Sequence, residues 1–142
     1  MAETQLWDWL KGLLPRGRYD RIESPDTAAG FPDVDYTITG GYSGTIELKD
    51  ARFPARKPAF KNEQDGLHIS QISWLLNEAN YSGVCWIVAR VRPKVFWIHG
   101  RKAVKFNGCT TLRALATHVL EGQRILPRDL KMINAMLRGE LQ

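Results

Sequence analysis

Hydrophobic and polar residues alternate in two stretches of the first half of the chain, and each pattern predicts a β-strand. The stretches are 33–39 and 45–49, and in both every second residue is apolar: Val34, Tyr36 and Ile38, then Ile46 and Leu48. The residues between them, 40–44, have the sequence Gly-Gly-Tyr-Ser-Gly, which is typical of a turn. We therefore predict a β-hairpin.

Side chains two positions apart on a strand point to the same face of the sheet. Glu47 and Lys49 therefore share a face of the second strand, and Asp33 and Asp35 share a face of the first. A turn near Gly40 brings Asp33 beside Glu47. A turn centred two residues later instead sets Asp35 opposite Lys49, so the register decides which acid lies in the patch. In either register two carboxylates and one ammonium group come together.

Helical spacing of apolar residues predicts four helices, with the following inward-facing residues: Leu6, Trp9, Leu10, Leu13 and Leu14 before Pro15; Ile69, Ile72, Leu75, Leu76 and Ala79; Leu112, Leu115, Ala116 and Val119 after a cap at Thr110 or Thr111; and Leu130, Ile133, Met136 and Leu137 after Leu126-Pro127. Two further strands are predicted over 84–91 and 94–98, and 50–66 is predicted to be a long loop. A helix between two strands of one sheet implies at least one parallel pairing. The sequence therefore predicts an α/β fold with a mixed sheet and flanking helices.

The composition fits one globular domain, with 44% hydrophobic and 25% charged residues among 142. The formal net charge of +5 favours polyanionic partners to a modest degree. No apolar run approaches the ~20 residues of a membrane span, and the N-terminus lacks the basic and apolar regions of a signal peptide. We therefore expect a cytoplasmic protein with no membrane partner, in which Cys85 is a small buried residue.

Two carboxylates and a lysine on one patch suit metal-assisted phosphoryl chemistry. Carboxylate oxygens hold Mg²⁺, which keeps several waters and accepts phosphate oxygens as further ligands. Such a metal activates a bound water and neutralises charge on the phosphoryl oxygens. Lys49 would place a cation beside the scissile phosphate or the attacking water. The competing interpretation is that Asp33 and Glu47 are solvated strand-end acids that pair with Lys49 across the hairpin.

The segments Gly30-Phe31-Pro32-Asp33 and Ile46-Glu47-Leu48-Lys49 together resemble the core motif of the PD-(D/E)XK nuclease superfamily. They are most similar to its small stand-alone members: VRR-NUC-type domains, archaeal Holliday-junction resolvases and small phage-encoded nucleases. Three more segments resemble family elements: Arg21-Ile22-Glu23, which can supply an extra acid; Gln71-Ile72-Ser73-Trp74-Leu75, a helix whose Gln lies near the active site; and the buried strand within 82–89.

The resemblance implies a restriction-endonuclease-like mixed β-sheet core flanked by helices, in a single domain over 1–142. Its core would cover about 16–100 and its C-terminal helices about 110–140. The implied activity is Mg²⁺- or Mn²⁺-dependent cleavage of DNA, with branched DNA as a candidate substrate. The residues implied in the site are Asp33, Glu47 and the backbone carbonyl of Leu48 as metal ligands, Lys49 beside the water or phosphate, and Glu23 and Gln71 completing the site.

Several positions keep a second interpretation. Asp35 competes with Asp33 for the metal, and Glu3 or Asp8 on the first helix could replace Glu23 as the extra acid. Gln71 could be an ordinary polar residue at a helix margin, Lys49 an ordinary strand lysine, and Glu23 a surface residue paired with Arg18 or Arg21.

A basic stretch follows the proposed catalytic strand and is interleaved with Phe53 and Phe60. We expect it to contact DNA phosphates, with unpaired bases stacking on the aromatic rings; the alternative is a solvated loop. The basic residues are Arg52, Arg56, Lys57 and Lys61, and Arg16, Arg18 and Arg21 would extend the same positive surface.

The remaining expectations concern histidines, tryptophans and partners. His68 is predicted to pack under the long loop and His99 to be structural, so no zinc site is expected. Trp74 lies opposite the apolar stripe of its helix and would, if exposed, contact a second subunit or the last helices.

A homodimer would suit cleavage of two strands in recombination, repair or phage genome processing. The alternative functions are a non-catalytic nucleic-acid-binding or scaffold protein on the same fold and a structural subunit that binds an acidic protein.

Overall fold

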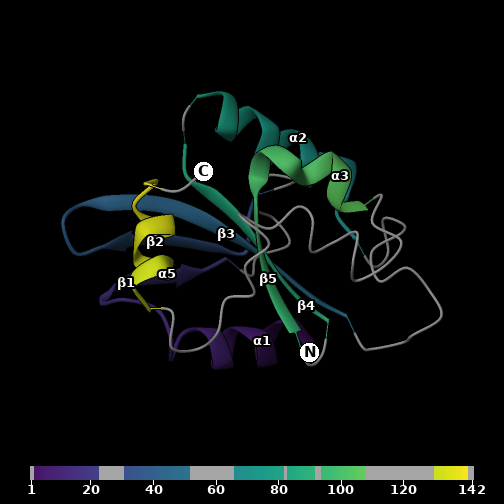
Figure 1. Cartoon of the computed structure of the whole chain (residues 1–142). Helices are drawn as coiled ribbons and strands as arrows, with labels where there is room; N and C mark the ends of the chain where they lie inside the picture. The colour runs from purple at the N-terminus through teal and green to yellow at the C-terminus, as the bar shows by residue number, and fades with distance from the viewer. Residues whose placement is uncertain are drawn as a thin grey trace.

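The computed structural model describes residues 2–22, 31–51, 66–81, 83–91, 94–107 and 130–140. One five-stranded sheet has the spatial order β1-β2-β3-β4-β5 (Figure 1). The strands are β1 Gly17–Arg21, β2 Val34–Ile38, β3 Tyr42–Ala51, β4 Cys85–Val91 and β5 Lys94–His99. β3 and β4 are parallel, whereas the other neighbouring strands are antiparallel. The predicted mixed sheet with a parallel pairing is confirmed.

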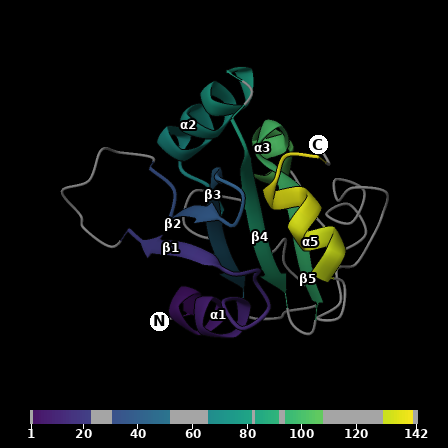
Figure 2. The ribbon, with the colours of Figure 1, turned by 90° about the vertical axis from the view of Figure 1, so that its left-hand side faces the viewer.

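Helices cover both faces of the sheet. They are α1 Ala2–Leu10, α2 Ile69–Asn80, the 3-10 helix η1 Gly100–Lys102, α3 Ala103–Asn107 and α5 Leu130–Leu137. α1 and α5 contribute to the hydrophobic core on one face, and α2 and α3 contribute to the core on the other. Figure 2 shows α2 and α3 close together, with α1 across the strands from them. The α/β fold class predicted from the sequence, a mixed sheet flanked by helices, is therefore confirmed.

The pleat of the central strands decides which side chains meet which helices, because alternate residues face opposite layers. Ile46 and Trp86 belong to the core under α1 and α5, whereas Cys85 and Ile87 belong to the core under α2 and α3. Cys85 is buried, as predicted. Glu47 pairs with Ile87 in the parallel register, so its side chain points toward the α2 layer.

The β2–β3 hairpin turns at Gly40 and Gly41. Both glycines have positive φ angles, 99° and 82°, a conformation that L side chains rarely adopt. Ile38 pairs with Tyr42 on one side of the turn, and Val34 pairs with Ile46 further along. The predicted turn near Gly40 is therefore the one that forms, and the register centred on Tyr42 is wrong.

Two elements near the N-terminus differ from prediction. α1 ends at Leu10 rather than continuing to Leu14, because Gly12 is a weak helix former and the chain turns there, with the Leu13 amide donating to the Leu10 carbonyl at 2.8 Å. β1 was not predicted, since its side chains are mostly exposed and its apolar alternation is weak. Backbone pairing with β2 makes it a strand.

The C-terminal half differs in smaller ways. β3 runs to Ala51, so the start of the predicted loop at residue 50 is wrong. The short helix α3 was not predicted, although Ala103 and Phe106 are buried at helical spacing. The predicted stripe of α5 is confirmed for Ile133 and Met136. The helix predicted after Thr110 or Thr111 and the residue His118 lie outside the described residues. Within the described ranges, no helix is long and apolar enough to cross a membrane.

Candidate active site

Asp33 is fixed against β3 by a backbone contact. It follows the buried Pro32 and immediately precedes β2. Its Oδ2 accepts a hydrogen bond from the Leu48 amide at 2.7 Å. Its own carbonyl accepts from the Ile22 amide at 2.7 Å, which ties the end of β1 to the same point. The Asp33 carboxylate therefore lies between β2 and the segment of β3 that carries Glu47.

Glu47 has a buried carboxylate, and one of its two oxygens accepts a hydrogen bond. Only 1% of the residue is exposed, although it is an acid in the middle of the sheet. Its Oε1 accepts a hydrogen bond from Gln71 Nε2 at 2.8 Å, whereas its Oε2 is buried and has no hydrogen-bond partner within the part of the chain that the structure describes. A buried oxygen left without a partner is costly in a folded protein and calls for a physical explanation.

The ionisation of Glu47 reflects its surroundings. Burial, which disfavours the charged form, raises the pKa of Glu47 well above its usual value, and the negative charge of Asp33 raises it further. The positive charge of Lys49 acts in the opposite direction. A cation close to both acids would stabilise the charged form of this pair.

Gln71 holds Glu47 from the first turn of α2. Its Oε1 accepts from the backbone amide of His68 at 2.8 Å, and its Nε2 donates to Glu47. Because a backbone amide can only donate, the oxygen of Gln71 must face His68 and its NH₂ group must face the carboxylate. The expected reach of Gln71 from the helix margin to the sheet is therefore observed.

The structure brings Lys49 and Asp33, rather than Asp35, to Glu47. Lys49 is half-buried and follows Glu47 on the same face of β3. Asp35 pairs with Thr45 on one side and with Asp20 of β1 on the other, one step further along the hairpin. Both acids share a face, but it is the Asp33 carboxylate that accepts a hydrogen bond from the backbone next to Glu47, at the Leu48 amide.

Two aromatic residues border this cluster. The rings of Phe31 and Trp74 lie 5.4 Å apart at an interplanar angle of 58°. Trp74 is partly buried and packs against the core under α2, so it is not an exposed subunit contact. Phe31, which lies two residues before Asp33 and outside β2, was not identified as a packing residue from the sequence.

The structure contradicts the prediction made for His68 and agrees with the one made for His99. His68 is exposed as the N-terminal cap of α2, so packing under the loop is wrong. The helical-wheel argument fails there because the cap has an extended backbone, with ψ of 157°. His99 is 5% exposed, and its Nδ1 accepts from the Arg101 amide at 3.1 Å, as expected of a structural histidine.

The predicted DNA-contact residues are only partly described. Arg18 is exposed on β1 and pairs with Asp20 at 3.2 Å, on the face of the sheet that carries Asp33. Arg21 falls on the opposite face of the same strand, because it pairs with the buried Val34. The remaining predicted residues, Glu23, Arg52, Arg56, Lys57 and Lys61, lie outside the described residues.

The donor set suits a hard divalent cation. In the parts of the chain that the structure describes, no three or more His, Cys, Asp or Glu side chains are arranged to hold a metal. The oxygens that could hold a cation here are those of two carboxylates, Asp33 and Glu47, with the Leu48 carbonyl on the same segment. Mg²⁺ is typically bound by one or two carboxylates while it keeps several waters. The partnerless Oε2 of Glu47 fits such an ion.

The chain has a similar solved structure but matches no family model or curated protein. The chain is similar to Hjc of Archaeoglobus fulgidus, a Holliday junction resolvase from an archaeal hyperthermophile, with 15% sequence identity and a TM-score of 0.42. The match covers 68% of this chain and 74% of that chain.

Proposed function

We propose that this protein is a Mg²⁺- or Mn²⁺-dependent endodeoxyribonuclease of the PD-(D/E)XK type. The observation that carries the proposal is the proximity of Asp33 to a Glu47 that is 1% exposed and has one oxygen without a hydrogen-bond partner among the described residues. A purely structural glutamate in the middle of a sheet would be expected to have both oxygens paired. The position of Lys49 on the same face adds the cation that phosphoryl chemistry uses.

Each residue has a proposed role in this reaction. Asp33, Glu47 and the Leu48 carbonyl would hold the metal, which when bound activates water and neutralises charge on the phosphate. Lys49 stabilises negative charge on the scissile phosphate or orients the attacking water. Gln71 holds the Glu47 carboxylate in one orientation, because its own amide is fixed by the backbone of α2.

The substrate and the assembly belong to the same proposal. We take DNA as the partner and branched DNA as the first substrate to test, because phosphate contacts and DNA shape can direct cleavage without base reading. Glu23 and the basic residues Arg52, Arg56, Lys57 and Lys61, with Arg18, are proposed to complete the site and the DNA contacts. A homodimer would place two such sites on two strands.

A cleavage assay tests the proposal. Supercoiled plasmid and a four-way junction are incubated with the wild-type protein, with Glu47→Gln and with Lys49→Ala, in Mg²⁺, in Mn²⁺ and in a chelator. Ser73→Ala, which changes an exposed position of α2, is the matched control. We expect metal-dependent cleavage by the wild type and the control and its loss in both site variants. Equal activity in all four proteins would exclude this site, and DNA binding without cleavage by the wild type would favour the non-catalytic alternative.

A further inference from the structure

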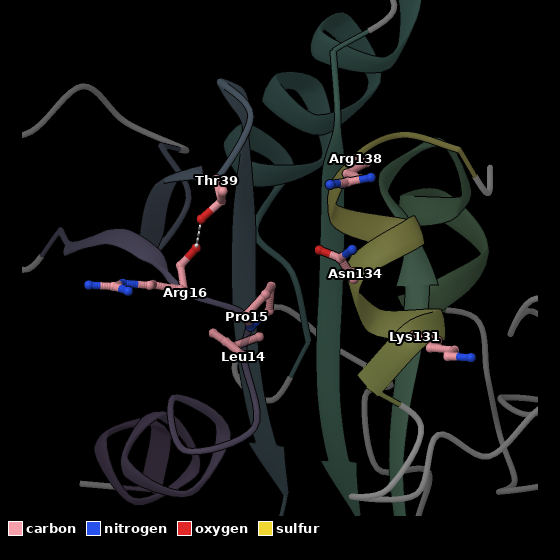
Figure 3. A pocket seen from close by; sticks show the side chains of 7 residues that line it. All are labelled: Leu14, Pro15, Arg16, Thr39, Lys131, Asn134 and Arg138. Carbon is pink, nitrogen blue, oxygen red and sulfur yellow. Dashed lines mark hydrogen bonds between the residues drawn. The ribbon is translucent and has the colours of Figure 1, made fainter.

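A cleft of about 410 Å³ lies between the connection that follows α1 and the helix α5 (Figure 3). The residues that line it are Leu14, Pro15, Arg16, Thr39, Lys131, Asn134 and Arg138. α5 packs on the sheet face that carries Ile46, whereas Glu47 points to the α2 face. The cleft is therefore on the opposite side of the sheet from the Asp33–Glu47 pair and belongs to a different site.

The lining of the cleft combines apolar and polar side chains. Asn134 of α5 lies on one wall, and Leu14, Pro15 and Thr39 lie on the other (Figure 3). The hydroxyl of Thr39 donates to the Arg16 carbonyl at 3.2 Å, which fixes that wall. An amide side chain offers both donors and an acceptor, the combination that the edge of a nucleobase can pair with. A flat, partly apolar group with hydrogen-bonding edges fits this lining.

The charges around the cleft are all positive among its described lining residues: Arg16, Lys131 and Arg138. Figure 3 shows the side chains of Arg16 and Lys131 on opposite sides of the cleft, each directed outward from it. Arg138 lies at one end, with its guanidinium carbon 4.9 Å from the centre of the Tyr42 ring and a nitrogen 3.8 Å from Glu140. A single anion inside the cleft would leave Arg16 and Lys131 unused, whereas a ligand with an anionic group on each side would reach both.

We infer that this cleft binds one unpaired nucleotide of a nucleic-acid strand, with the base inside and the flanking phosphates at Arg16 and Lys131. A strand that passes over the cleft carries one phosphate on each side of every base, which matches the two outward-directed cations. Unpaired bases insert into such sites because no pairing must be broken, and Leu14 with Pro15 supplies the apolar contact. This inference does not depend on the proposed nuclease activity.

Binding without metal tests the inference. Fluorescence anisotropy in a chelator compares a labelled thymidine octamer with an octamer of the same charge that lacks all bases. We expect the wild type to bind the thymidine octamer about tenfold more tightly. Arg16→Ala and Lys131→Ala should each weaken binding of both octamers and lower the salt slope by about 0.7. Asn134→Leu should remove the preference for bases, and Asn134→Asp, which conserves size, should do the same if the leucine variant does not fold.

Controls separate this site from general electrostatics and from the Asp33–Glu47 site. Arg101→Ala removes an exposed charge from η1 and should leave binding unchanged. Ser73→Ala, which changes an exposed position of α2 on the other side of the sheet, should bind the octamer as the wild type does. An octamer carrying 5-iododeoxyuridine should cross-link to 12–16 or 131–138. Equal affinity for the two octamers, an equal loss in Arg101→Ala, or cross-links confined to other residues would overturn the inference, as would binding of thymidine monophosphate as tight as that of the octamer.

Discussion

The side-chain amide of Gln71 connects the start of α2 to the carboxylate of Glu47. One end accepts from the His68 amide and the other donates to Glu47 Oε1, both at 2.8 Å. Because the helix fixes the amide and the amide fixes the carboxylate, Glu47 presents its second oxygen, Oε2, in one direction. The orientation of a strand residue is thus set by a residue in the first turn of a helix, 24 positions further along the chain.

Replacing Gln71 tests this connection. In Gln71→Leu, Glu47 loses its hydrogen-bond donor and its orientation, so we expect metal affinity or activity to fall by about 10–100-fold. The measurement is the Mg²⁺ concentration that gives half-maximal DNA cleavage. Ser73→Ala on the same helix is the control and should behave as the wild type. A Gln71→Leu variant that needs no more Mg²⁺ than the control would show that the amide has no positioning role.

Asp33, which immediately precedes β2, and Asp35, which lies within β2, give a second prediction. Asp33 contacts the Leu48 amide and lies beside Glu47, whereas Asp35 pairs with Thr45. We therefore expect Asp33→Asn to lower activity by more than the ~100-fold typical of a residue that only positions a ligand. Asp35→Asn should have a small effect on activity, because the Asp35 carboxylate lies two residues further along the hairpin than Asp33. Cleavage rates at saturating Mg²⁺ measure both, and the reverse order would assign the metal to Asp35.

Metal binding should also appear as stability. A ligand that binds only the folded state raises the free energy of unfolding by about 2.7 kcal/mol at one hundred times its Kd. We expect Mg²⁺ to raise the Tm of the wild type by several degrees. Glu47→Gln, which removes the charge that a cation would balance, should be at least as stable as the wild type without metal and should show no Mg²⁺-dependent rise. Differential scanning fluorimetry with and without Mg²⁺ measures this, and Arg101→Ala is the control. An equal rise in Glu47→Gln would place the metal elsewhere.

The hairpin and its acids could be predicted because local chemistry determines them. Gly40 and Gly41 accept the positive φ angles that the turn requires, and strand alternation then carries Asp33 toward Glu47. The partners of the site depend on tertiary contacts, which single-sequence patterns do not contain. Phe31 meets Trp74 from a distant part of the chain.

Other elements escaped prediction for related physical reasons. β1 has a mostly exposed sequence and owes its strand conformation to pairing with β2. His68 lies at the helix boundary, where the extended backbone takes its side chain off the helical wheel. Hydrophobic periodicity predicts elements whose own side chains are buried, and it fails where the backbone or a distant residue stabilises the conformation.

Close packing at the start of η1 gives a stability prediction. A Cβ added at Gly100 would lie well inside the van der Waals distance of the Cys85 sulfur and 3.3 Å from the Cys85 Cβ and carbonyl oxygen. Gly100→Ala should therefore destabilise the fold by about 1–3 kcal/mol, the typical cost of overpacking a core. Removing the sulfur in Cys85→Ala should reduce that cost in the double variant. Urea denaturation of the wild type, the two single variants and the double variant measures the coupling between the two substitutions. Strictly additive changes in the free energy of unfolding would show that the two positions do not meet.

His99 predicts how stability depends on pH. Burial, followed by the nearby charges of Arg101 and Lys102, lowers the pKa of His99 from 6.5 to about 4. The folded protein thus holds a neutral imidazole, while the unfolded chain takes up a proton near pH 6.5. Stability that is present above pH 6.5 is consequently lost as pH falls through 6.5 toward 4, by up to about 3 kcal/mol.

His99→Asn keeps an oxygen that can accept from the Arg101 amide and has no titrating group, so it should lose less stability over this range. Urea denaturation at pH 7.5 and pH 4.5 measures both slopes. Because acids titrate in the same window in both proteins, the difference between their slopes isolates the histidine. Equal slopes would mean that folding does not lower the pKa of His99.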